Sequence, residues 1–317
     1  NMTPSFSTDI VHLAFQKWGI KLKKGSKTWS GSCPVCREGD DRLIVWQEGN
    51  YICRVCGTKG WLLSLKDLSP TERAYREKHL QKTEEEEKQR RAERLADWQS
   101  GFRAGLLISW HNMGQPQLDY WHSQGIPDWA IEQYNLGYCD KKLFQGQDEL
   151  LFESPAYVIP IRDPIDNKLV NVQYRLTELP ANGGGKYRQE PDLPAAAFYA
   201  EQGRLSGPVI VVEGSKKAIV MYNLLDKTIQ IVGMPSQSPA GSLIKALGQF
   251  SEVFLALDKD IGKLDKSGYD AAVKRYGALL KGKCRLVPLS RKIDNSAIRY
   301  GMGKSGFLDL MHMARRV

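Results

Sequence analysis

The clearest pattern in the chain is a series of short apolar runs that alternate with helical patterns between residues 208 and 288. Two of these runs, Pro208–Val212 and Val253–Leu257, are unbroken, which is typical of strands buried on both faces of a parallel sheet. The alternation predicts a βαβαβαβ module with right-handed crossovers. The predicted strands are 208–212, 228–232, 253–257 and 284–288, and the predicted helices are 215–225, 240–249 and 267–281.

Upstream of this module the pattern is strand-like and then highly charged. Residues 157–161 and 169–175 flank a turn that contains Pro164 and Asn167, which predicts a hairpin. Arg162 and Arg175 each close one arm of this hairpin, at the carboxyl end of the arm. Residues 72–97 carry eight acidic and eight basic side chains and almost no apolar ones. Because the charges cancel, we expect a solvated helical linker here rather than a rod that binds nucleic acid.

Four of the six cysteines form two Cys-x-x-Cys pairs. Cys33 and Cys36 are followed after sixteen residues by Cys53 and Cys56, a spacing at which two knuckles supply four thiolates to one zinc ion. Residues 43–46 and 51–53 predict two strands between the knuckles. We therefore expect a zinc ribbon whose ion is structural, because no coordination position is left open.

The predicted ribbon also interleaves cations with aromatic side chains, a mixture that binds single-stranded nucleic acid by charge and stacking. Trp46 and Trp61 are expected to cover the small core of this domain. Tyr51 and Arg54 are the predicted contacts to nucleic acid.

The composition of the chain indicates which binding partners and which cellular compartment to expect. The 317-residue chain has a net charge of +9 and a pI near 9.1, which favours a polyanionic partner. No apolar run approaches membrane-spanning length and no signal-peptide pattern opens the chain, so we expect no membrane partner. The cysteine usage favours a reducing compartment. Cys139 and Cys284 are isolated and are predicted to pack in the core.

Carboxylates stand where two of the buried runs end. Glu213 follows the first run, and Asp258 and Asp260 follow the second. Because open α/β sheets bind ligands at the carboxyl ends of their strands, we expect these acids to converge. Clustered carboxylates repel one another unless a cation lies between them, and an incomplete cage of oxygen ligands favours Mg²⁺ or Mn²⁺. Asp294 is a fourth candidate, whereas Glu213 and Asp260 could instead cap the following helices.

Two glycine-rich segments do not fit a nucleotide-hydrolysing motor. Residues 182–185 lack the strand, helix and Gly-Lys-Ser/Thr of a P-loop, and Gly301–Ser305 has Ile298 where the first P-loop glycine belongs.

The acidic motifs carry a family resemblance. Val211-Val-Glu-Gly214 and Leu257-Asp-Lys-Asp260 resemble the two signature motifs of the TOPRIM domain, which occurs in bacterial-type primases, topoisomerases, small nucleases and recombination mediators. Residues 118–126 and 134–138 look like the helical segment that precedes the catalytic sheet of DnaG-type primases. Ile159–Asp163, Arg175 and Lys186-Tyr187 resemble the basic motifs of their polymerase core. The resemblance covers most of residues 30–295.

The resemblance implies a DNA primase of the bacterial or phage cytoplasm, which makes short RNA primers on single-stranded DNA from ribonucleoside triphosphates, with a replicative helicase acting in trans. Two Mg²⁺ or Mn²⁺ ions would be held by Glu213, Asp258 and Asp260, with Asp294 as a further catalytic acid. The residues implied to contact nucleic acid or nucleotide are Arg162, Arg175, Lys186, Tyr187, Lys216 and Lys259, together with Tyr51 and Arg54 of the ribbon.

The chain also departs from the DnaG-type pattern. All four predicted zinc ligands are cysteines, and Lys259 stands between the two aspartates where a small residue is common. Ser215-Lys216-Lys217 occupies a region where cellular primases carry another acid, which resembles phage or mobile-element versions more closely. Asn295 follows Asp294 where paired acids are frequent. No helicase-binding domain follows, so we expect a stand-alone primase or the front part of a longer protein.

Together these features predict a multi-domain α/β protein in four parts. They are a zinc ribbon (1–68), a charged helical linker (69–97), a mixed α+β basic subdomain (98–206) and a TOPRIM catalytic subdomain with a C-terminal tail (207–317). Two other functions remain open: a metal-dependent TOPRIM nuclease, and a non-catalytic recombination mediator that binds DNA through the zinc ribbon and the TOPRIM domain.

Overall fold

A computed structural model of the chain describes residues 10–25, 28–35, 40–46, 49–53, 58–63, 70–145, 151–178, 185–191, 193–236, 239–258, 267–289 and 292–317. The chain divides into two compact units, residues 1–89 and 90–317. The division falls within the long helix α2 (Pro70–Ser100), whose first residue is a proline, a residue that the first position of a helix tolerates. No helix of the described residues is both long and apolar enough to cross a membrane.

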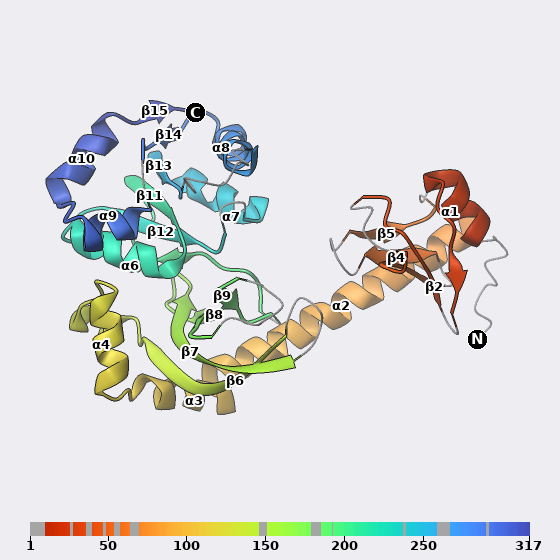
Figure 1. Cartoon of the computed structure of the whole chain (residues 1–317), viewed down its shortest axis with the longest axis horizontal. Coiled ribbons are helices and arrows are strands. Elements are labelled where there is room, and N and C mark those ends of the chain that lie inside the picture. The colour runs from red at the N-terminus through yellow and green to blue at the C-terminus, as the bar shows by residue number, and fades with distance from the viewer. Residues whose placement is uncertain are drawn as a thin grey trace. The chain divides into compact units, whose positions relative to one another are not determined.

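The first unit is a small antiparallel sheet packed against one helix (Figure 1). Its strands pair in chain order, and Leu43, Val45, Cys33 and Cys53 pack with Ile10 of the helix in the core. Two of its strands were predicted between the cysteine pairs, and the other three were not. The elements are α1 (Ile10–Trp18), β1 (Lys23–Lys24), β2 (Thr28–Gly31), β3 (Leu43–Trp46), β4 (Asn50–Cys53) and β5 (Lys59–Trp61).

The second unit begins with three helices and a four-stranded antiparallel sheet. The helices are α3 (Phe102–His111), α4 (Gln115–Ser123) and α5 (Asp128–Gln133), and the strands are β6 (Gly137–Gln145), β7 (Leu151–Arg162), β8 (Leu169–Leu176) and β9 (Tyr187–Gln189). The predicted hairpin is confirmed as β7 and β8. Strands β6 and β9 extend it on either side and were not predicted.

The predicted alternating module is confirmed as a six-stranded sheet with the order β10-β12-β11-β13-β14-β15. Its four central strands are parallel, and each edge strand is antiparallel to its neighbour. The strands are β10 (Phe198–Tyr199), β11 (Pro208–Glu213), β12 (Gln230–Met234), β13 (Glu252–Ala256), β14 (Cys284–Leu286) and β15 (Arg315–Arg316).

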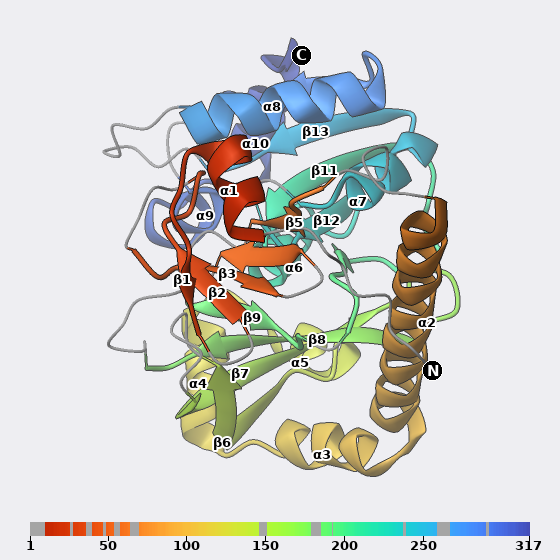
Figure 2. The ribbon, with the colours of Figure 1, turned by 90° about the vertical axis from the view of Figure 1, so that its right-hand side faces the viewer.

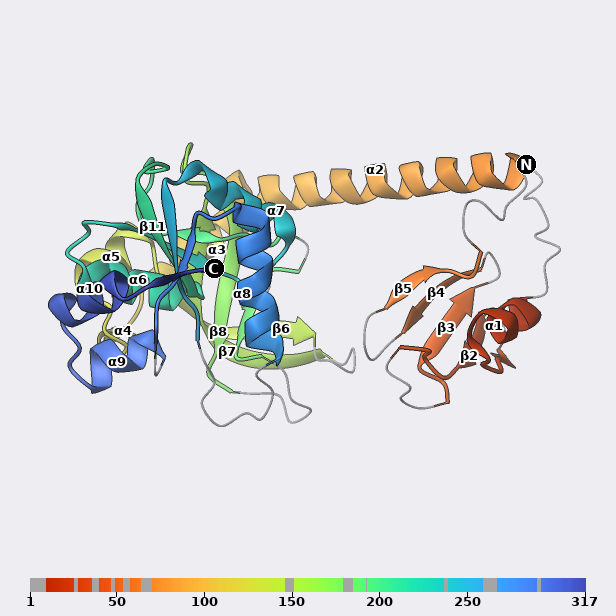
Figure 3. The same ribbon diagram turned by 90° about the horizontal axis from the view of Figure 1, so that it is seen from above.

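Helices cover both faces of this sheet, which explains the unbroken apolar runs of its strands. Ile210 and Val212 of β11 pack on the face of α6 (Ser215–Leu224), α9 (Ile293–Arg299) and α10 (Lys304–His312). Val209 and Val211 pack on the opposite face, against α7 (Gly241–Ala246), the short 3₁₀ helix η2 (Leu247–Gln249) and α8 (Ser267–Leu280). Figure 3 shows α8 on one side of β11, with α6, α9 and α10 on the other.

The two sheets of the second unit share one hydrophobic core. Ile159 and Ile161 of β7 belong to the same buried cluster as Ile210 of β11 and Ala218 of α6. Figures 1 and 2 show the four-stranded sheet lying beside the parallel one. Cys139 and Cys284 are both buried, as predicted. This shared core fixes the basic hairpin relative to the acidic strand ends.

Candidate functional site

The two acid-bearing strand ends lie side by side, as predicted. Strands β11 and β13 are parallel neighbours in which Val212 pairs with Ala256, so Glu213 and the segment leading to Asp258 leave the sheet at the same edge. Gly214 turns the chain there with φ of 91°, a left-handed conformation that favours glycine. Its N–H donates to the Met234 carbonyl at 2.8 Å, and α6 begins at the next residue.

Two lysines from the first turn of α6 pair with two of these acids. Lys217 Nζ forms an ion pair with Asp258 Oδ2, and Lys216 Nζ lies 2.9 Å from Asp294 Oδ2 on α9. Lys292 Nζ is also 4.0 Å from Asp258 Oδ2. Asp258 and Asp294 are buried, so their charges are balanced within the protein rather than by water.

The lysines keep Asp294 ionised. Burial alone would raise the pKa of its carboxyl, but Lys216, Lys217 and the Asn295 backbone N–H together hold that pKa below its usual value. A carboxylate in this state offers negative charge at neutral pH.

A second group of side chains approaches from the four-stranded sheet. Arg175 of β8 lies between Tyr157 of β7 and Tyr187 of β9 in the strand register. Its guanidinium sits 4.7 Å from the centre of the Tyr120 ring, and Tyr120 stacks on Tyr157 with the ring centres 3.7 Å apart. These aromatic contacts fix the direction of the guanidinium.

The basic sheet and the acidic edge belong to one site. Tyr187 is 38% exposed overall. Burial of its hydroxyl nevertheless raises the pKa to about 12, Arg175 opposes this rise, and Asp294 and Asp258 add to it. The pKa of Lys186 is lowered by burial and then by the charges of Arg175 and Lys216. Each side chain therefore feels charges from the other element.

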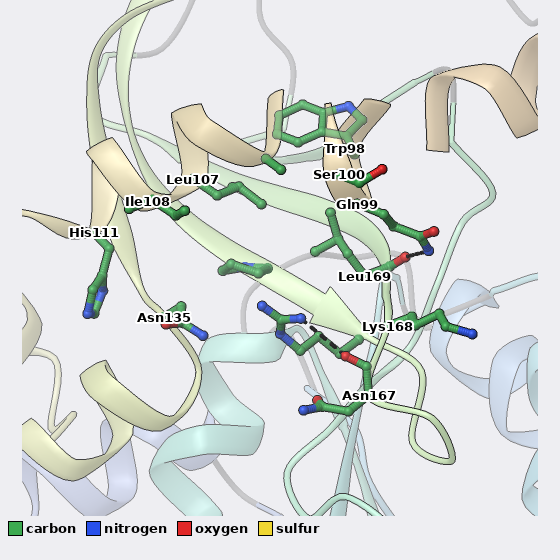
Figure 4. A pocket seen from close by; sticks show the side chains of 13 residues that line it. Trp98, Gln99, Ser100, Leu107, Ile108, His111, Asn135, Asn167, Lys168 and Leu169 are labelled. Atoms are coloured by element: carbon green, nitrogen blue, oxygen red, sulfur yellow. Dashed lines mark hydrogen bonds between the residues drawn. The ribbon is translucent and has the colours of Figure 1, made fainter. Parts of the chain in front are cut away.

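Arg162 ends β7 and Arg175 stands next to the end of β8, as predicted, but in an antiparallel hairpin these are opposite ends, and Arg162 lies away from this site. Arg162 pairs with Leu169 beside the turn, whereas Arg175 pairs with Tyr157, so about 16 Å of strand separates them. Arg162 lines a pocket of about 550 Å³ with Trp98, Leu107 and Asn135. Figure 4 shows this pocket between α3, the end of α2 and the β7–β8 turn.

The guanidinium of Arg162 donates to the Asn167 carbonyl at 3.1 Å, and burial lowers its pKa. No carboxylate in the described part of the chain forms an ion pair with it.

The acidic edge fits a divalent cation only in part. Its oxygen donors suit Mg²⁺ or Mn²⁺. However, among the described residues no three His, Cys, Asp or Glu side chains gather closely enough to hold a metal. Asp258 and Asp294 are already paired with lysines. Asp260 and Lys259 lie outside the described residues, so the predicted ligand set is only partly visible.

The predicted zinc site is also described only in part. Cys33 and Cys53 are both buried. The Val35 N–H donates to Cys33 Sγ at 3.4 Å, and the Cys53 N–H donates to the Thr58 carbonyl at 2.8 Å. Cys36, Cys56 and Arg54 lie outside the described residues, and the zinc site stays a prediction.

The expectation that Trp46 and Trp61 cover the core of the ribbon is wrong, because among the described residues it is Tyr51, with Trp18 and Trp29, that packs against this core. Tyr51 is half-buried and meets Trp18 edge-on, with the ring centres 4.8 Å apart. Trp61 is also half-buried, and the Arg76 guanidinium lies 3.6 Å from its ring centre. Tyr51 therefore has a packing role in addition to the predicted contact to nucleic acid.

Sequence reasoning named Lys216 as a contact to nucleic acid but missed Lys217 and Tyr120. A signal for the lysines was present, because a first helical turn favours acidic rather than basic residues. Two adjacent lysines there indicate nearby acids. Nothing in the local pattern marked Tyr120, whose role comes from the tertiary contact with Arg175.

No family model matches the chain, and no curated protein matches it. Several solved structures do. The zinc-binding and RNA polymerase domains of the Aquifex aeolicus primase match with a TM-score of 0.52 at 16% identity, over 99% of this chain and 85% of that one. A DnaG primase catalytic domain solved with single-stranded DNA matches with a TM-score of 0.53 at 15% identity, over 73% and 83%.

The E. coli primase catalytic core matches with a TM-score of 0.50 at 16% identity, over 67% of this chain and 79% of that one. At such identities the likeness is one of fold. It confirms the predicted α/β class, and it agrees with the resemblance read from the motifs.

Proposed function

We propose that this chain, which has the fold of DnaG-type primases, is itself a DNA-dependent RNA polymerase that makes short primers on single-stranded DNA. The observation that supports this most directly is the pairing of a basic surface with an acidic edge. Arg175 lies on β8 and Lys186 directly precedes β9 of the four-stranded sheet, whereas Asp258 follows β13 of the parallel sheet and Asp294 lies on α9. Phosphoryl transfer needs both, because phosphate charge and a divalent cation meet at the reacting centre.

In this proposal the acids Glu213, Asp258 and Asp260 bind Mg²⁺ or Mn²⁺, which would activate the attacking hydroxyl and stabilise the leaving pyrophosphate. Arg175 and Lys186 neutralise the charge of the triphosphate or template. The charge of Arg175 is directed before substrate arrives, because its guanidinium is held against the Tyr120 ring.

Tyr187 would act as a hydrogen-bond donor rather than as a nucleophile. With its pKa raised to about 12 by burial first and by the two aspartates, the hydroxyl stays protonated at neutral pH. A protonated phenol is a weak nucleophile.

The first unit would bind zinc through Cys33, Cys36, Cys53 and Cys56 and contact unpaired template bases through Tyr51 and Arg54. Elemental analysis should find one zinc ion per chain. A fully folded, metal-free protein with four reactive thiols in this unit would contradict the proposed ribbon. Ribonucleoside triphosphates, and a replicative helicase acting in trans in a bacterial or phage-infected cytoplasm, complete the proposed partners.

The decisive experiment incubates the chain with single-stranded template, ribonucleotides and Mg²⁺ or Mn²⁺, and resolves the products by length. Asp258→Asn should reduce oligoribonucleotide synthesis at least about 100-fold, since it removes a charge at the reacting centre. Asp270→Asn is the matched control, because Asp270 is exposed in the first turn of α8. Strand cleavage without synthesis would favour the nuclease, and DNA binding with neither activity would favour the recombination mediator.

A further inference from the structure

The pocket beside the β7–β8 turn takes no part in the proposed function. Its volume of about 550 Å³ lies within the range of roughly 300–1,000 Å³ that is usual for sites of small organic ligands. Every residue that lines it, from Trp98 to Leu169, belongs to the second unit. The pocket is therefore built within one compact part of the chain.

The pocket has an apolar side and a polar side. Figure 4 shows Leu107 and Ile108 of α3 on one side, and Asn135 and Asn167 on the other. Arg162 joins the polar side, because its guanidinium donates to the Asn167 carbonyl at 3.1 Å. Apolar walls with a small number of polar groups are typical of sites that bind and orient a small molecule.

The guanidinium of Arg162 has donors to spare. It is half-buried, and its bond to the Asn167 carbonyl uses one of the five N–H donors of an arginine. Arginine stays charged in proteins, so burial here leaves a cation that is only partly solvated and has no carboxylate partner among the described residues. A phosphate or carboxylate would accept hydrogen bonds from the remaining donors and balance this charge.

Two other basic side chains line the pocket, and each already contacts an acid. Lys168 Nζ lies 2.8 Å from Asp166 Oδ2, and His111 Nε2 lies 3.3 Å from Glu132 Oε2. In the part of the chain that the structure describes, Arg162 is thus the basic residue of this pocket whose charge is left for a ligand.

We infer that this pocket binds a small organic anion, with a phosphate or carboxylate group at Arg162 and an apolar body against Leu107 and Ile108. The site is separate from the acidic edge, since about 16 Å of strand lies between Arg162 and Arg175. It does not depend on the proposed function.

Isothermal titration calorimetry of the full chain tests this site with simple probes. 1-Naphthyl phosphate carries both an anionic group and an apolar body, whereas inorganic phosphate and 1-naphthol each carry one of them. 1-Naphthyl phosphate should bind one per chain and at least about 10-fold more tightly than either part alone. Binding no tighter than that of inorganic phosphate would overturn the inference. 1-Naphthoate, compared with 1-naphthyl phosphate, shows whether the site prefers a carboxylate or a phosphate.

Substitution of Arg162 tests the anionic half of the site. Arg162→Met keeps an apolar stem but removes the cation, and the affinity for 1-naphthyl phosphate should fall at least about 10-fold. Arg316→Met is the matched control, because Arg316 is exposed on β15, and it should leave the affinity unchanged. A loss in Arg175→Met but not in Arg162→Met would place the probe at the four-stranded sheet's other end and overturn the inference.

A second variant covers the case in which Arg162→Met folds poorly. Ile108 lines the pocket and is 70% exposed, so Ile108→Glu should fold normally, repel the anion and lower its affinity at least about 5-fold. Phe102→Glu is the control on the same helix, since Phe102 is 79% exposed and does not line the pocket. Equal affinity in the two variants would contradict the proposed site.

Single-stranded DNA is the competing occupant, because its phosphates are also anions. An oligonucleotide that displaces 1-naphthyl phosphate would assign the pocket to the template and overturn the inference. Simultaneous binding of both would support a separate site. A chain that binds the probe but makes no RNA would keep this site and defeat the primase proposal, and a chain that makes primers without binding the probe would do the reverse.

Discussion

The two ends of the β7–β8 hairpin carry one arginine each, and the structure gives them different surroundings. At the open end Arg175 lies against Tyr120, and its charge reaches Tyr187 and Lys186 beside the acidic edge. At the turn Arg162 contacts the Asn167 carbonyl and lines a pocket. The difference teaches that two similar basic residues on one hairpin cannot be assigned one role, because the strand places them about 16 Å apart.

The largest expected effect is at Arg175. Arg175→Ala removes the cation held over the Tyr120 ring, and primer synthesis should fall about 100-fold. Arg175→Lys should recover only part of the loss, since lysine lacks the planar group that stacks on an aromatic ring. Initial rates of oligoribonucleotide synthesis measure both. Full activity in Arg175→Ala would remove this end of the hairpin from the site.

The second largest effect is expected on the salt dependence of DNA binding, which should distinguish Arg175 from Arg162. If Arg175 contacts a phosphate of single-stranded DNA, Arg175→Ala should reduce the slope of log affinity against log salt by about 0.7. Arg162→Ala should leave the slope unchanged if its pocket lies off the path of the template. Fluorescence anisotropy with a labelled oligonucleotide, repeated across salt concentrations, gives both slopes. Equal reductions would show that the template reaches both ends.

A smaller effect on synthesis is expected at Arg162. Arg162→Ala removes a partly buried guanidinium and its hydrogen bond to the Asn167 carbonyl. Because this group is remote from the acids, the rate of synthesis should change less than about 3-fold, whereas the free energy of unfolding should fall by about 1 kcal/mol. Rates and denaturant unfolding of the same preparation check the two parts. A loss as large as that of Arg175→Ala would contradict the comparison.

The smallest effect concerns the turn itself. Asp163 Oδ1 accepts the Ile165 N–H at 2.8 Å and the Asp166 N–H at 3.3 Å. Asp163→Ala should therefore lower the free energy of unfolding by about 1 kcal/mol and leave synthesis unchanged. Asp163→Asn is the control, since its amide oxygen can still accept both bonds. A fall in synthesis with normal stability would connect the turn to the reaction.

Much of the fold could be predicted because its strands are buried on both faces. Val209–Val212 form a continuous apolar run whose side chains fill the clusters on either side of the sheet. The strands that were missed are edge strands of their sheets or, for β2, the neighbour of an edge strand. In β6, Asp140, Lys141 and Lys142 interrupt the apolar pattern, and β10 and β15 have two residues each, too few to show a period.

The site was less predictable than the fold for a specific reason. The acids could be placed at one edge because parallel strands end together, and the repulsion between them indicated a cation. Local pattern could not show that two lysines of α6 pair with two of these acids. The ion pairs of Lys217 with Asp258 and Lys216 with Asp294 join residues 41 and 78 positions apart.

Gly233, next to the last residue of β12, also has a consequence for mutational tolerance. A methyl group at this position would lie 2.6 Å from the Gly214 carbonyl oxygen and 3.0 Å from the Ser215 Cα. Both are backbone atoms at the start of α6, so the helix would have to move, together with the lysines that hold two acids. A saturation library at position 233, screened for folded and active protein, should therefore return glycine alone. The distance between β12 and the start of α6 is therefore so short that position 233 can accommodate no side chain.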